Sequence, residues 1–144
     1  MQNVKHIKDQ IEKIEEAYEY MLAYAAQGRS DEGAGPDGAQ IRTFLNQFSE
    51  AQIKLNETTP AIIAAIPDAS DFMDAFRSES KVMAAILKVL LSKSNISSEV
   101  IDNTNGLISV RAYLTSLFFL DKSVYTTESK FRELERFDGM KINF

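Results

Sequence analysis

The sequence contains no cysteine and only one histidine, and both shortages limit the chemistry that it can perform. Without cysteine, the chain has no disulfide, no thiolate metal ligand and no cysteine nucleophile. The single histidine, His6, lies opposite the apolar stripe of an expected helix, so we expect it to point to solvent. Di-iron bundles need Glu-x-x-His pairs on two helices, and a serine triad needs a histidine beside its nucleophile. We therefore expect no metal and no cofactor, and these absences favour a protein that is not an enzyme.

Long hydrophobic runs and an excess of basic residues are also missing. The two longest apolar runs, 82–91 and 107–120, contain Lys88 and Arg111 and are too short to span a bilayer. The first residues are charged and helical in pattern, unlike a signal peptide. The net charge of −5 offers no basic patch of the kind that attracts nucleic acid or anionic lipid. These observations predict a cytoplasmic protein that binds neither membranes nor nucleic acid.

The residues that are present favour one globular domain over 1–144. A chain of 144 residues that is 44% hydrophobic can bury a core of its own. Its charge is uneven, because residues 1–72 hold 12 acids and 6 bases whereas residues 73–144 hold 9 acids and 10 bases. A self-complementary contact between two copies can use this asymmetry, and solvated faces explain it equally well.

Hydrophobic residues recur at helical spacing along most of the chain, and no segment alternates as a strand would. We therefore predict an all-α fold, a four- to five-helix bundle with a long N-terminal helix and a short C-terminal helix. Residues 70–92 are expected to form its central helix. The expected helices cover about 3–27, 38–55, 61–66, 70–92, 97–120 with a break at 103–106, and 126–137.

Two segments are expected to be loosely attached to this bundle. Residues 29–38 are rich in glycine and include Pro36, which predicts a flexible loop. Its formal G-x-G-x-x-G pattern follows a helix and contains acidic residues, so a dinucleotide site is not expected. Residues 122–144 contain the short final helix and the tail. They either dock on the bundle or form a detachable arm that lies in a groove of a partner.

Three polar residues interrupt the apolar faces of the expected helices. Glu79 and Gln52 each lie within an apolar stripe, and Arg111 lies at the edge of another. One interpretation joins them in a ligand-binding or catalytic pocket, with Glu79 as base or ligand anchor and the loop 29–38 as a lid. The other interpretation is structural, with an ion pair between Glu79 and Arg111 or with side chains that reach solvent at the end of the bundle. We favour the structural interpretation, because no nucleophile or metal ligand accompanies the three.

Several large apolar residues lie off the main helical stripes and are candidates for a contact with another chain. They are either packed inside the chain or exposed for a partner, and the sequence leaves both alternatives open. They are Tyr20, Tyr24, Phe119, Leu120, Phe131 and Leu134.

The sequence therefore predicts a non-enzymatic interaction or regulatory module that associates with itself, as a homodimer, or with another protein. The alternative is a small-molecule-binding or catalytic bundle built around Glu79. A third interpretation is a viral or phage helical protein that binds a host factor.

Overall fold

The computed structural model describes residues 2–33 and 38–124, and this part of the chain contains six α-helices and no strand. The prediction of an all-α fold is thus confirmed. The long helices are α1 (Gln2–Ala26), α2 (Ile41–Asn56) and α4 (Ser70–Leu91), and the shorter ones are α3 (Thr59–Ala65), α5 (Ser98–Asn105) and α6 (Ile108–Phe119). A 3-10 turn, Pro67–Ala69, precedes α4, and a π-helical turn, Leu120–Val124, follows α6.

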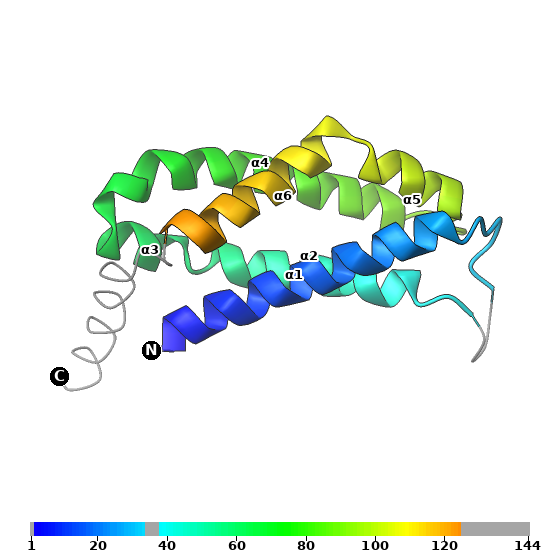
Figure 1. Ribbon diagram of the computed structural model, residues 1–144, viewed down its shortest axis with the longest axis horizontal. Helices are drawn as coiled ribbons and strands as arrows, with labels where there is room; N and C mark the ends of the chain where they lie inside the picture. The colour runs from blue at the N-terminus through cyan, green and yellow to red at the C-terminus, as the bar shows by residue number, and fades with distance from the viewer. Residues whose placement is uncertain (1, 34–37, 125–144) are drawn as a thin grey trace.

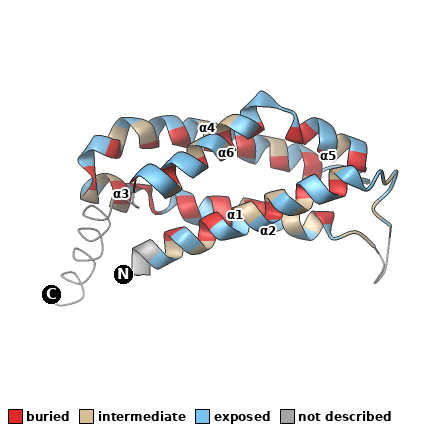
Figure 2. Cartoon of the chain, viewed as in Figure 1, coloured by how far each residue is buried: buried red, intermediate tan, exposed pale blue. Residues whose placement is uncertain are grey.

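The helices form an elongated bundle (Figure 1). Helix α1 packs along α2 and against α5, while α4 packs against α2 and α6. Helices α5 and α6 follow one another along the remaining side of the bundle. The buried side chains line the inner sides of the long helices, as Figure 2 shows. The helix expected to be central, α4, contacts α2, α3 and α6, whereas α1 contacts α2 and α5.

The helix boundaries follow local signals in the sequence. Helix α1 ends before Gly28, whose φ of 64° places it in the left-handed region that favours glycine. The Ser97 side chain caps α5 by accepting a hydrogen bond from the backbone N–H of Val100 at 3.2 Å. The break expected at 103–106 separates α5 from α6. Helix α2 begins at Ile41, a few residues later than expected, and the helix expected over 126–137 lies outside the described residues.

An ion pair between Glu32 and Arg42 joins the segments at one end of the bundle. Nε and Nη2 of Arg42 donate to the two carboxylate oxygens of Glu32 at 2.7 and 2.9 Å. The same guanidinium donates to the backbone carbonyls of Leu91 and Lys93 at 3.2 and 2.5 Å. These carbonyls lie at the C-terminal end of α4, where a helix leaves its last carbonyls without partners. Glu32 also accepts a hydrogen bond from the backbone N–H of Ile96 at 3.0 Å.

Tyr24 and Ser98 fasten the same end of the bundle from the side of α1. The hydroxyl of Tyr24 donates to the carbonyl of Ile96 at 2.5 Å, and the hydroxyl of Ser98 donates to the carbonyl of Tyr24 at 2.6 Å. The backbone of Arg29 exchanges two further hydrogen bonds with Ser98, at 2.8 and 2.9 Å. The first residues of the glycine-rich loop, 29–33, are therefore hydrogen-bonded to the segment before α5.

We predict that the Glu32–Arg42 pair stabilises the protein cooperatively. Arg42→Ala and Glu32→Gln should each lower the free energy of unfolding by about 2 kcal/mol, because each leaves a charged, partly buried partner with fewer hydrogen bonds. Denaturant unfolding of both single variants and of the double variant measures the coupling between them. Arg77→Ala, at an exposed position on α4, is the control. Strictly additive losses would show that the two side chains act independently.

Candidate functional site

Gln52, one of the predicted site residues, is buried and links α2 to α4. Its side chain is 2% exposed, and its Nε2 donates to the carbonyl and the hydroxyl oxygen of Ser80 at 2.8 and 2.9 Å. The hydroxyl of Ser80 also donates to Oδ1 of Asn56 at 3.1 Å. These bonds satisfy polar groups inside the bundle, as a structural cluster does.

The Tyr113 hydroxyl lies beside this buried cluster. Its ring packs against Phe48 and Phe76, with centroid distances of 6.0 and 5.2 Å. Burial raises the pKa of the Tyr113 hydroxyl, an effect that the neighbouring Gln52 and Ser80 oppose. Oη nevertheless makes no well-formed hydrogen bond within the described part of the chain. Sequence reasoning missed this residue, because a tyrosine within an apolar stripe looks like an ordinary core residue.

Glu79 is half-buried and links α4 to α6 through Ser116. The hydroxyl of Ser116 donates to Oε1 of Glu79 at 2.5 Å. Arg111 is exposed and lines a surface groove next to α1. The expected ion pair between Glu79 and Arg111 is absent from the described residues, and no hydrogen bond joins either of them to Gln52. Arg111 lies five residues before Ser116. Residues at this spacing point to different sides of an α-helix, so Arg111 does not face Glu79.

Two of the predicted contact residues are buried by the chain itself. Tyr24 and Leu120 are each 0% exposed, so for these two the intrachain alternative holds. Tyr20 is half-buried, and its ring stacks on Phe44 with a centroid distance of 4.4 Å. Phe131 and Leu134 lie outside the described residues.

Phe119 is exposed, and His6 is partly buried. Phe119 is 50% exposed, and its ring contacts Phe72 of α4 with a centroid distance of 4.8 Å. It therefore keeps half of its surface available to a partner. His6, expected to point to solvent, is half-buried.

A different set of apolar residues is exposed on α1, on α6 and at the residue before α6. Leu22, Leu107 and Phe118 are 46%, 45% and 56% exposed, and we call the surface that they form the α1–α6 face. Leu22 and Leu107 line a surface groove of about 620 Å³ together with Arg111. Phe118 lies seven residues after Arg111, which places both on the same side of α6. Ile108, which adjoins Leu107, is 84% exposed.

The sequence placed these leucines and Phe118 in the apolar stripes of their helices and so in the core. They are exposed because apolar residues surround most of α6, and a helix on the outside of a bundle can bury only one of its sides. The buried side of α6 carries Val110, Tyr113 and Leu117. The opposite side is left uncovered by the described residues.

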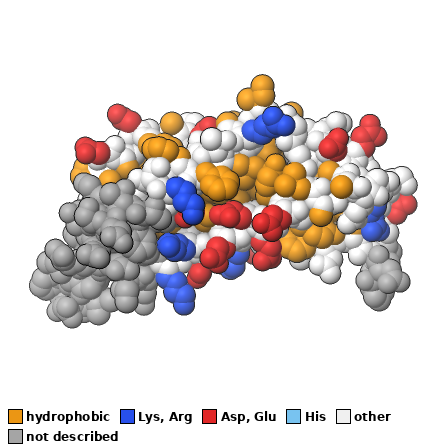
Figure 3. Space-filling view, in the orientation of Figure 1, with side chains coloured by type: hydrophobic (Ala, Val, Ile, Leu, Met, Phe, Trp, Pro, Cys, Tyr) orange, Lys and Arg blue, Asp and Glu red, His pale blue; other side chains and the backbone are white. Residues whose placement is uncertain are grey.

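Acidic residues of α1 border the α1–α6 face. Desolvation raises the pKa of the Glu15 carboxyl, and the nearby charges of Asp121, Glu19 and Glu12 raise it further, whereas Lys122 lowers it. Figure 3 shows hydrophobic side chains over the middle of this side of the molecule, next to acidic side chains over α1. The face thus has an apolar centre with acidic side chains next to it, and Arg111 lines its groove.

We predict that Glu15→Gln stabilises the protein at neutral pH. A carboxyl whose pKa is raised by folding binds its proton more tightly in the folded state, so its contribution to stability is lost as the pH rises. Removing the charge should therefore raise the free energy of unfolding at pH 7, by less than about 1 kcal/mol because the group is only partly buried. The gain should shrink as the pH falls through the raised pKa of Glu15 and disappear below the ordinary value of 4.5, where the carboxyl is protonated in both states. Thermal unfolding at several pH values measures this difference, and a gain that is independent of pH would contradict the electrostatic explanation.

Comparison with known proteins finds no matching protein family, no similar curated protein and no similar solved structure. Within residues 2–33 and 38–124, no three acidic or histidine side chains are grouped so that they could hold a metal ion. In the same part of the chain, no helix has the length and the apolar character needed to cross a membrane.

Proposed function

We propose that this protein is a non-enzymatic interaction module that associates with a second copy of itself through the α1–α6 face. The observation that carries the proposal is a set of large apolar side chains that are about half exposed, of which Leu22 and Leu107 line one groove and Phe118 lies further along α6. Contiguous apolar surface of this kind is typical of protein contacts, where a buried apolar centre is surrounded by a polar rim.

The charges around the face favour a second copy as the partner. In a two-fold contact, a residue on one protomer meets a different residue on its partner, and the reverse contact forms as well. Glu15 and Glu19 lie seven and three residues before Leu22, on the same side of α1, and Arg111 of α6 lines the groove beside Leu22 and Leu107. Arg111 has no ion-pair partner among the described residues, so a partner can supply one. A two-fold axis through the apolar centre would pair the acidic side chains of each copy with Arg111 of the other.

The alternative of a small-molecule or catalytic bundle around Glu79 has less support. The Glu79 carboxylate already accepts a short hydrogen bond from Ser116, and Gln52 is engaged by Ser80. Both side chains hold helices together. This agrees with the structural interpretation of these residues and not with the ligand-binding one. Binding of a different protein, such as a host factor, would use the same α1–α6 face. Substitution of Phe118 distinguishes this alternative from self-association.

The dimer should depend on Phe118. Phe118→Asp places a charge in the apolar centre of the contact and should weaken the dimer by about tenfold or more, which corresponds to 1.4 kcal/mol. Light scattering after size exclusion, over a range of concentrations, measures the dissociation constant. Ile53→Asp on α2 is the matched control, since Ile53 is 61% exposed but contributes to no part of the face. Circular dichroism verifies that both variants are folded.

A monomeric wild-type protein at all concentrations would refute self-association. A monomer that retains a Phe118-dependent complex with another protein would support the host-factor alternative. Equal weakening by Phe118→Asp and Ile53→Asp would show that the α1–α6 face has no special role.

Charge reversal tests the proposed pairing across the dimer. Arg111→Glu should weaken the dimer because it places like charges opposite each other in the contact. Adding Glu19→Arg to that variant should restore part of the affinity, because opposite charges then face each other again. If the double variant loses as much affinity as the two single variants lose together, the reciprocal arrangement is contradicted.

A further inference from the structure

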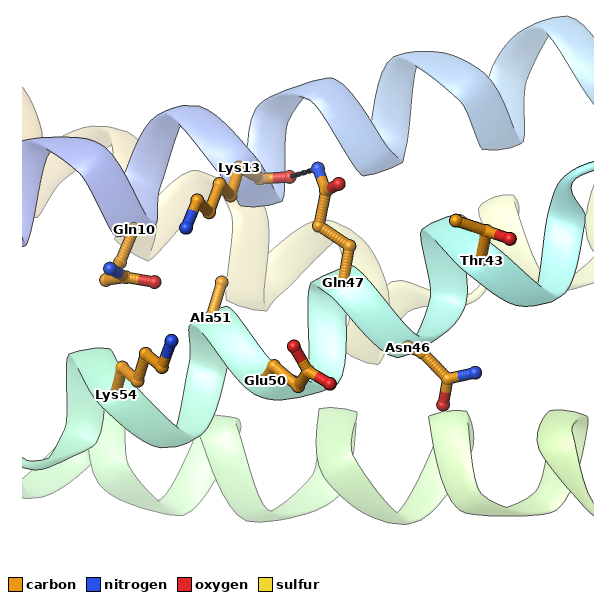
Figure 4. Close-up of a pocket in the computed structure, with 8 residues that line it drawn as sticks. All are labelled: Gln10, Lys13, Thr43, Asn46, Gln47, Glu50, Ala51 and Lys54. Atoms are coloured by element: carbon orange, nitrogen blue, oxygen red, sulfur yellow. Dashed lines mark hydrogen bonds between the residues drawn. The ribbon is translucent and has the colours of Figure 1, made fainter.

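A polar groove of about 450 Å³ lies between α1 and α2, on a different side of α1 from the α1–α6 face. Figure 4 shows its residues along the two facing helices. Amide side chains, a threonine, two lysines and one carboxylate line it, and no large apolar side chain is among them. They are Gln10, Lys13, Thr43, Asn46, Gln47, Glu50, Ala51 and Lys54.

Gln10 is the buried polar residue of this groove. It is 3% exposed, and its Oε1 has no hydrogen-bond partner in the described part of the chain. A buried acceptor without a partner is unfavourable, because it has lost its hydrogen bonds to water and gained none in the protein. Such an atom in the wall of a groove is suited to accept a hydrogen bond from a bound group that carries a donor.

Lys13 and Lys54 extend toward Gln10 from the two helices. In Figure 4 their ammonium ends point to the side of the groove where the Gln10 amide lies, above Ala51. Ala51 is 1% exposed and leaves room because it has only a methyl side chain. Neither ammonium has an ion-pair partner within residues 2–33 and 38–124. Two unpaired cations and a buried acceptor thus meet at one end of the groove.

The remaining polar groups separate this cationic end from the carboxylates. Gln47 donates from Nε2 to the carbonyl of Lys13 at 3.0 Å and to Oε1 of Glu16 at 3.1 Å, which ties α2 to α1 across the groove. The Glu50 side chain points away from the two lysines, toward the side of Asn46 (Figure 4). The groove therefore offers an anion two positive charges at one end without a carboxylate between them.

We propose that this end of the groove binds a phosphate group that carries a proton, either free hydrogen phosphate or the singly protonated form of a phosphate monoester. The ammonium groups of Lys13 and Lys54 would each donate to its anionic oxygens, in charge-assisted hydrogen bonds. Its P–O–H group would donate to Oε1 of Gln10 and so supply the donor that this buried oxygen lacks. A sulfate dianion has the same size and negative oxygens but no hydroxyl to donate. This site is independent of the proposed self-association.

Discrimination between phosphate and sulfate is the test. Calorimetric titration of the full chain with inorganic phosphate, at constant ionic strength near pH 7, should detect binding, and sulfate should bind at least about tenfold more weakly, because it leaves the Gln10 oxygen unpaired. A titration with glycerol phosphate below about pH 6, where most of the monoester keeps one P–O–H group, shows whether the site accepts a monoester as well as free phosphate. Binding of phosphate and sulfate with equal affinity, or of neither anion at millimolar concentration, would overturn the proposal.

Substitutions test the two lysines and Gln10 separately. Lys13→Gln and Lys54→Gln should weaken the binding of both anions, because each removes a positive charge, and both positions are exposed enough to tolerate the change. Gln10→Leu should lower phosphate affinity to that of sulfate and leave sulfate affinity unchanged. Lys5→Gln, an exposed lysine on α1 outside the groove, is the control for general charge effects. If it weakens binding as much as Lys13→Gln does, or if Gln10→Leu keeps the discrimination, the site as described is wrong.

Discussion

The ion pair between Glu32 and Arg42 is the contact on which the arrangement of the helices depends most. Each side chain bonds to the backbone of another segment as well as to its partner, so the pair connects the first loop, α2, the end of α4 and the segment before α5. Charge-assisted bidentate bonds are directional, and they therefore fix the orientation of these segments as well as their proximity. Tyr24 and Ser98 reinforce the same end from α1.

This fixed end determines which surfaces the later helices cover. Because the segment before α5 is held against α1, the chain must turn at 103–106 to return along α4 as α6. The turn is stabilised by Asn105, whose Nδ2 donates to the carbonyl of Met21 at 3.2 Å. After the turn, α6 buries only the side that faces α4 and α2. Its other apolar side becomes the α1–α6 face, and the self-association proposed for this protein is thus a consequence of how α5 is anchored.

Helix α1 carries three different environments around its circumference. One side forms the core, a second presents the acidic residues beside the α1–α6 face, and a third places Gln10 and Lys13 in the groove with α2. Its charged positions are therefore divided between two surfaces of different character. A protein partner at one surface and an anion at the other would both contact α1. This helix also contacts α5, next to the end of the bundle that the Glu32–Arg42 ion pair holds together.

The sequence by itself determined the helices, because periodicity, caps and glycine stops are local properties of the chain. It also determined the break at 103–106, where asparagine and glycine disfavour a helix. Only the tertiary structure decided that Tyr24 is buried while Phe118 is exposed, since a helix that is apolar nearly all round gives no indication of which side its neighbours will cover. In the same way, it paired Glu79 with Ser116 and left Oε1 of Gln10 without a partner in the described part of the chain. Such contacts depend on how distant helices approach one another, and no spacing along the chain encodes them.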